Sequence, residues 1–164
     1  MEFEGWDNEL KDFILLSTKH EVKMLMVGGG AVNFHGYQRH SSDVDFWIDL
    51  SESNLNRLIQ VFQEMGYDIN DFPSSVKNAE QNISLKFSPT SLNIELITSF
   101  NINKEFGVAF QESIPVQIGE NKLFKWNVIS YDDLITSKIK AARPKDLLDI
   151  QELERRKNNN FKNL

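Results

Sequence analysis

The chain has 164 residues, no cysteine and a formal charge of -6, and 40% of its residues are hydrophobic. This length predicts one domain, and the apolar content is enough for a buried core, which argues against a disordered chain. The missing cysteine excludes disulfides, a thiolate nucleophile and cysteine-ligated metal sites. The acidic N-terminus and the short apolar runs predict a cytoplasmic protein with no signal peptide and no membrane partner.

The charge is distributed unevenly along the chain. Residues 1–137 contain 10 basic and 20 acidic side chains, whereas residues 138–164 contain 8 basic and 4 acidic ones. A basic end on an acidic body indicates a local surface that receives anions, although a solvated helix with a frayed tail gives the same pattern. We expect a single domain over residues 1–156 and a flexible basic tail over residues 157–164.

The predicted elements alternate between helices and strands. Helices are expected over residues 7–19, 31–36, 51–66, 130–143 and 144–156, and strands over 23–28, 43–49, 82–88, 91–98 and within 114–129. Ser51 and Ser130 are suitable N-caps, Gly66 and Pro144 are suitable helix ends, and the second pair of strands turns at Ser88-Pro89-Thr90. This order predicts an α/β (α+β) domain, with a mixed sheet, flanking helices and two C-terminal helices.

Three consecutive glycines, Gly28 to Gly30, stand between the first predicted strand and a short helix. Backbone N–H groups at a helix N-terminus attract phosphate, and the missing side chains let a phosphate approach closely. A tight turn is the alternative explanation of the same glycines. The segment matches neither the P-loop pattern nor the dinucleotide-binding fingerprint.

Three carboxylates stand on predicted strands. Asp43 and Asp45 are two residues apart on one strand, so they share a face. Like charges held together are costly unless a cation neutralises them, and carboxylate oxygens suit Mg²⁺ or Mn²⁺. Glu95 lies in an otherwise apolar strand, where it could complete a metal site or accept a proton from an attacking hydroxyl. A solvent-facing strand is the alternative for each of them.

The basic end carries Lys138, Arg143 and Lys145 around a proline. Lys138 borders the apolar face of a predicted helix, so its stem can lie on the core while its ammonium reaches into a cleft. Asp146 and Asp149 could orient the cations, and we expect both to be structural. Helix-surface salt bridges are the alternative explanation of this cluster.

Two histidines, His35 and His40, precede the aspartate pair and raise the possibility of a transition-metal site. One is expected in a short helix and the other in a loop. Their spacing does not match the helical zinc motif, so we do not favour this interpretation.

Together these features resemble the polymerase-β-like nucleotidyltransferase superfamily, which has a hydrophobic strand, Gly-Gly or Gly-Ser, a short helix and then Asp-x-Asp. A closer resemblance is to small bacterial nucleotidyltransferase-like proteins related to the abortive-infection (AbiEii) toxin group. They share a Gly-Gly-x-Ala…His-Gly-x-x-Arg-x-Ser/Thr-x-Asp-x-Asp pattern, an Asp-Leu-Leu-Thr-Ser strand and a Lys…Gly/Ala-Arg-Pro-Lys-Asp…Asp ending. The matching residues are Gly28, Gly29, Ala31, His35, Gly36, Arg39, Ser41, Asp43, Asp45, Glu95, Leu96, Ile97, Thr98, Ser99, Lys138, Ala142, Arg143, Pro144, Lys145, Asp146 and Asp149.

The resemblance implies a Mg²⁺- or Mn²⁺-dependent transfer of a nucleoside monophosphate from NTP to a hydroxyl acceptor. The implied catalytic and metal-binding residues are Asp43, Asp45 and Glu95, and Glu95 replaces the Asp that these relatives usually have. The implied nucleotide-binding residues are Gly28, Gly29, Arg39, Ser41, Lys138, Arg143 and Lys145. Arg39 could instead hold the shape of the loop that carries the two aspartates.

The resemblance leaves the acceptor open. It implies a tRNA end, a protein side chain, as in toxins of toxin–antitoxin systems, or a small hydroxylated molecule. A toxin role also implies an antitoxin protein as partner. The alternative from another class is a non-catalytic nucleotidyltransferase-like module that binds a nucleotide or a protein, and the three carboxylates argue against it.

Overall fold

The structure is a computed structural model that describes residues 7–87 and 92–162. Its helices are α1 (Asn8–Lys19), α2 (Gly28–Phe34), α3 (Glu52–Glu64), α4 (Ser74–Lys77), α5 (Phe106–Gln111), the 3₁₀ turn η1 (Glu120–Lys122), α6 (Tyr131–Ala141) and α7 (Pro144–Lys162). Its strands are β1 (Met24–Val27), β2 (Asp43–Ile48), β3 (Ile83–Leu85), β4 (Asn93–Ile97), β5 (Ile114–Ile118) and β6 (Phe124–Val128). The predicted turn at residues 88–90 lies outside the described residues.

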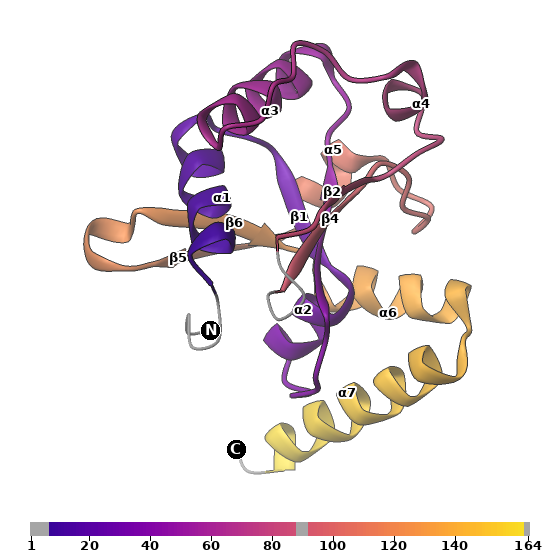
Figure 1. The fold of residues 1–164 in the computed structure, drawn as a ribbon. Helices are drawn as coiled ribbons and strands as arrows, with labels where there is room; N and C mark the ends of the chain where they lie inside the picture. The colour runs from indigo at the N-terminus through magenta and orange to yellow at the C-terminus, as the bar shows by residue number, and fades with distance from the viewer. Residues whose placement is uncertain (1–6, 88–91, 163–164) are drawn as a thin grey trace.

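The strands form one six-stranded sheet in the order β3-β4-β2-β1-β6-β5 (Figure 1). The pairs β2–β4 and β1–β6 are parallel, whereas β1–β2, β3–β4 and β5–β6 are antiparallel. The sheet is therefore mixed, and the predicted α+β fold is confirmed. The antiparallel β1–β2 pair lies at its centre; the glycine segment follows β1 directly, and the two aspartates lie on β2.

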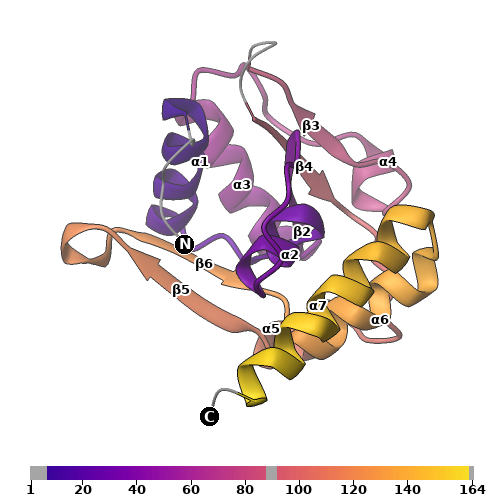
Figure 2. The same ribbon diagram turned by 90° about the horizontal axis from the view of Figure 1, so that it is seen from below.

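The two faces of β2 have different environments. Val44 and Phe46 are buried in the hydrophobic core, and the Phe46 ring centroid lies 6.1 Å from that of Phe13 on α1. Figure 2 shows α1 and α3 on one side of the sheet and α6 and α7 on the other. Because side chains alternate along a strand, Asp43 and Asp45 face away from Phe46 and toward the C-terminal helices.

Local signals account for several helix ends. The hydroxyls of Ser51 and Ser130 accept hydrogen bonds from the third residue of their helices, at 3.3 and 3.2 Å. Gly66 takes a φ of +97° just after α3, and Ala142 takes the left-handed conformation at the end of α6. The helix ends at Ser51, Gly66 and Ser130 were predicted from sequence, and they hold because a cap depends on neighbouring residues.

Two predicted boundaries are wrong. The short helix begins at Gly28 rather than Ala31, so the glycines form its first turn instead of preceding it. The final helix does not end near Arg156 but continues to Lys162, so the predicted flexible tail is helical over residues 157–162. The Arg156 guanidinium lies 5.5 Å from the Tyr37 ring centroid, and Lys157 Nζ lies 4.3 Å from that of Tyr131. These cation–π contacts hold this turn of α7 against the body.

The segment between β4 and β5, for which the sequence predicts no helix or strand, packs on the sheet. The rings of Phe100 and Phe106 lie 5.3 and 5.1 Å from the ring of Trp47 on β2. Lys140 on α6 donates a hydrogen bond of 3.0 Å to Asn101. The segment therefore covers part of the core. In the described residues, no helix combines the length and apolar content that crossing a bilayer requires.

Candidate active site

A cavity of about 320 Å³ opens between α2, the start of β2 and the α6–α7 turn. Its lining residues are Gly28, Gly29, Arg39, His40, Ser41, Ser42, Asp43, Asp45, Lys138, Arg143 and Lys145. Every candidate nucleotide-binding residue from the sequence is in this set. Of the three candidate carboxylates, Asp43 and Asp45 line the cavity and Glu95 does not.

Glu95 is placed beside the aspartate pair by strand register. In the parallel β2–β4 pair, Asp45 is opposite Glu95 and Asp43 is opposite Asn93. Burial, with the negative charges of Asp43 and Glu95, raises the pKa of Asp45 to about 6, although Lys138 and Lys145 act in the opposite direction. Three carboxylates thus lie close together on this face of the sheet, and the protonated form of Asp45 is favoured by burial first and by its acidic neighbours second.

Asp43 and Asp45 offer hard carboxylate oxygens at the cavity, which suits Mg²⁺ or Mn²⁺. Burial raises the pKa of Asp45, the charges of Asp43 and Glu95 add to that effect, and a cation there would offset those charges. The Glu95 carboxylate instead accepts a hydrogen bond from the Ser84 hydroxyl on β3. Among the described residues, no three acidic or histidine side chains already form a metal-holding group. The aspartate pair therefore fits a metal, with Glu95 as its neighbour.

The glycines are needed for close packing against β2 and its preceding loop. Gly28 has a φ of +58°, and a Cβ there would collide with the Asp45 carboxylate. A Cβ on Gly29 would lie 2.7 Å from Ser41 Oγ, closer than real contacts allow. The Ser41 hydroxyl itself donates a 2.8 Å hydrogen bond to the backbone carbonyl of Asp43. The glycine turn, the Ser41 loop and Asp45 thus form one tightly packed wall of the cavity.

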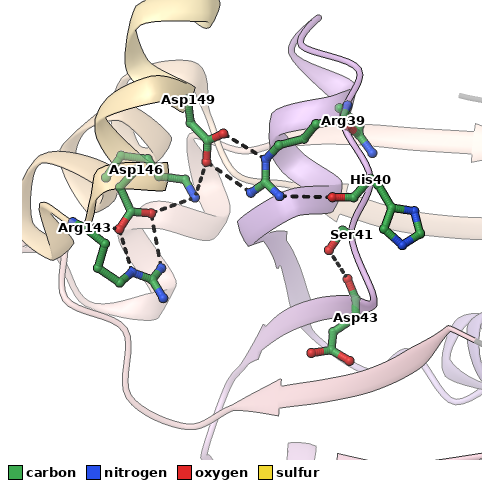
Figure 3. Close-up of polar contacts among 9 residues, drawn as sticks. Arg39, His40, Ser41, Asp43, Arg143, Asp146 and Asp149 are labelled. Carbon is green, nitrogen blue, oxygen red and sulfur yellow. Dashed lines mark hydrogen bonds and ion pairs between the residues drawn. The ribbon is translucent and has the colours of Figure 1, made fainter.

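A chain of ion pairs includes three cations that line the cavity, Arg39, Lys138 and Arg143, and Figure 3 shows it. Arg143 Nε lies 2.6 Å from Asp146, Lys138 Nζ lies 3.2 Å from Asp146 and 3.0 Å from Asp149, and Arg39 Nε lies 2.8 Å from Asp149. The two aspartates are 0% and 1% exposed. The chain joins α6 and α7 to the loop before β2, so the predicted structural role of Asp146 and Asp149 agrees with their burial and contacts.

These ion pairs determine how far each of the four cations at the cavity is free to bind a ligand. Arg39 is held by Asp149 and donates a 3.3 Å bond to the His40 carbonyl, which favours the alternative that it shapes the loop. Lys138 is only 5% exposed and lies between two aspartates. Although burial acts to raise the pKa of Asp146, its hydrogen bonds with Arg143 and Lys138 hold that pKa below its ordinary value. Lys145 is exposed and has no ion pair in the described part of the chain.

His35 has a structural environment. Its Nε2 lies 2.8 Å from the Ile129 carbonyl, and its ring contacts those of Phe34 and Tyr131. Burial lowers its pKa, which favours the neutral ring. His35 does not line the cavity, whereas His40 does. These contacts connect α2 to the start of α6.

Two polar residues lie beside Glu95 on the sheet, and sequence reasoning missed one of them, Ser84. Asn93 precedes Glu95 by two residues and shares its face of the sheet, and its buried side-chain oxygen has no hydrogen bond with any residue that the structure describes. Ser84 is opposite Glu95 in the β3–β4 pair. The period-2 alternation of β4 already places Asn93 on the face of Glu95 from the sequence alone. Nothing in the sequence indicated Ser84, because its position depends on the register of two strands.

Comparison with known proteins identifies a family for the chain. A family model described as "Nucleotidyltransferase of unknown function (DUF6036)" matches residues 2–164. No curated protein matches the chain.

Proposed function

The chain belongs to this family of nucleotidyltransferases, and from that premise we propose that it transfers a nucleoside monophosphate from an NTP to a hydroxyl acceptor in a Mg²⁺- or Mn²⁺-dependent reaction. One observation carries the proposal: Asp43 and Asp45 line a cavity whose other walls are a glycine turn and a basic helix junction. An acidic pair opposite basic groups suits a ligand that is bound through both a metal and direct cationic contacts.

Asp43 and Asp45 would hold the metal, which when bound would neutralise charge on the triphosphate and on the departing pyrophosphate. Lys145 would bind phosphate oxygens directly, because it is exposed at the cavity and has no ion pair in the described residues. Lys138 and Arg143 would act more weakly, because Asp146 already neutralises part of their charge. Backbone N–H groups at Gly28 and Gly29 would add hydrogen bonds to phosphate.

Glu95 would accept the proton of the acceptor hydroxyl as its oxygen attacks the α-phosphorus. The bond from that phosphorus to the pyrophosphate oxygen breaks, and pyrophosphate leaves with the electron pair. Arg39 and Ser41 would preserve the loop that positions Asp43. The rate enhancement would come from positioning and electrostatics, which require no covalent intermediate.

For the acceptor, we propose three chemical classes and no single molecule. We expect an RNA end, a protein side chain or a small hydroxylated molecule in the cytoplasm, and a toxin role would add an antitoxin partner. The exposed basic residues Arg155 and Lys162 on α7 favour RNA, because phosphates are recognised through such cations. The acidic body favours the other two classes.

The test incubates each of the four labelled NTPs with total RNA, a protein lysate and a panel of aminoglycosides and lincosamides, with Mg²⁺ or Mn²⁺. Label transfer by the wild type, lost in the Asp43→Asn/Asp45→Asn variant, supports the proposal and identifies the acceptor class. Thermal unfolding with NTP plus Mg²⁺, and with NTP plus EDTA, distinguishes the alternative. Stabilisation by NTP that is independent of metal, with no transfer in any mixture, would favour a non-catalytic module.

A further inference from the structure

Ser84 lies at the end of a row of three polar side chains across the sheet. Strand pairing places Ser84 opposite Glu95, and Glu95 opposite Asp45. Directly opposed residues project from the same face, so all three face the side of the sheet that holds the cavity. The row thus runs from the proposed metal site to a hydroxyl that belongs to the protein itself.

The contact between Ser84 and Glu95 is the one that an acceptor would make. Ser84 Oγ donates a hydrogen bond to Glu95 Oε2. In the proposed reaction, the acceptor hydroxyl must donate to this same carboxylate before its proton is removed. Ser84 is also exposed, and β3 is the edge strand of the sheet that residues 7–87 and 92–162 form, so none of the described strands pairs with its outer side.

Other hydroxyls near the cavity lack this arrangement. Ser41 donates to the backbone carbonyl of Asp43, which is a weak base. Ser42 lines the cavity but has no hydrogen bond to a carboxylate among the described residues. Among the residues that the structure describes, Ser84 has the side-chain hydroxyl that donates a hydrogen bond to one of the three carboxylates Asp43, Asp45 and Glu95.

We propose that Ser84 is a site of self-modification, at which the protein transfers a nucleoside monophosphate from a bound NTP to its own hydroxyl; this inference rests on the proposed function. Ser84 Oγ forms a bond to the α-phosphorus while the bond from that phosphorus to the pyrophosphate oxygen breaks. Pyrophosphate leaves with the electron pair, and the Ser84 proton passes to Glu95. The product is a phosphodiester that joins the nucleoside to Ser84 and removes the hydrogen-bond donor from Glu95.

The experiment needs no external acceptor. The purified full-length protein is incubated with each α-labelled NTP and Mg²⁺, and the adduct is measured by intact mass and located by peptide mapping. We expect one nucleoside monophosphate on Ser84, at least a tenfold loss of label in Ser84→Ala, and label retained in Ser84→Thr. Ser74→Ala is the matched control, because Ser74 is an exposed serine at the start of α4, outside the cavity.

Two further measurements separate the possible failures. Metal-dependent stabilisation of the wild type by NTP reports on the proposed function without requiring any transfer. If this stabilisation is present and Ser84 carries no label, or the label is on another hydroxyl, the self-modification proposal is overturned and the proposed function stands. If the stabilisation is itself missing, both fail.

The contact is also testable without metal or nucleotide. A double-mutant cycle of Ser84→Ala and Glu95→Gln in EDTA should give non-additive unfolding midpoints, because the two side chains share one hydrogen bond. Additive midpoints would show that Ser84 does not contact Glu95 in solution, and would overturn the proposal independently of any activity.

Discussion

Replacing Asp45 with asparagine should stabilise the metal-free protein at neutral pH. Burial and the nearby charges of Asp43 and Glu95 raise the pKa of Asp45 from its ordinary 3.8 to about 6. The folded protein therefore binds this proton more tightly than the unfolded chain does. Stability consequently falls as the pH rises from about 4 to about 6, and the loss persists above that range. Asparagine has a similar shape and no charge, so it removes this penalty.

The size of the effect follows from the pKa difference of about 2 pH units. At about 1.4 kcal/mol per pH unit, the penalty has an upper bound of about 3 kcal/mol. Asp45 is partly exposed, and solvent screening reduces the value to roughly half, about 1.5 kcal/mol. In a chain of this size 1 kcal/mol shifts Tm by roughly 2–4 °C, so the variant should melt about 3–6 °C above the wild type near pH 7.5.

The assay is thermal unfolding in EDTA over a series of buffers from about pH 4 to about pH 8. The gain in Tm should be complete above about pH 6 and absent near pH 4, where wild-type Asp45 is itself protonated. Mg²⁺ should raise the wild-type Tm and narrow the gap, because a bound cation relieves the same repulsion. Asp12→Asn, an exposed substitution on α1, is the control. No gain at neutral pH, or an equal gain at every pH, would refute the reasoning.

Three other substitutions test the walls of the cavity. Gly28→Ala should destabilise the protein by at least about 1–3 kcal/mol, measured by denaturant unfolding, because φ is +58° and the new Cβ meets Asp45; a neutral effect would contradict the packing. Asp149→Ala should cost about 3–5 kcal/mol by the same method, because Arg39 and Lys138 lose a buried partner; a loss below about 1 kcal/mol would mean that the ion pairs are weak. Lys145→Ala should change stability by less than about 0.5 kcal/mol yet reduce the Mg²⁺-dependent thermal shift with NTP. An unchanged shift, equal to that of a Lys125→Ala control on β6, would remove Lys145 from the proposed site.

The ion-pair chain limits which cations of the basic end can contact a nucleotide directly. The sequence suggested that Lys138 and Arg143 would meet the nucleotide directly. In the structure Asp146 and Asp149 neutralise much of that charge. Asp149 also pairs with Arg39, which joins α7 to the loop before β2. Lys145 remains exposed at the cavity. Charge along a chain indicates where cations gather, whereas their pairing depends on which acids the fold brings beside them.

Patterns that depend on near neighbours were determined by the sequence alone. Strand alternation placed Asp43 and Asp45 on one face, and Ser51 and Ser130 capped their helices, because each depends on only a few adjacent residues. The order of elements also indicated the mixed sheet. The end of α7 was misjudged because the helix continues to Lys162, past Arg156 and Lys157, which contact the distant rings of Tyr37 and Tyr131.

The tertiary structure alone decided the partners of the candidate residues. Glu95 lies beside Asp45 only because β2 and β4, far apart in the chain, pair in one register, and Ser84 joins them only through β3. A shift of one residue would turn every side chain of a strand to the opposite face, and packing over the whole sheet prevents that shift. The net charge of -6 showed none of this, because the position of each charge in the fold, and not their sum, determines what the site can bind.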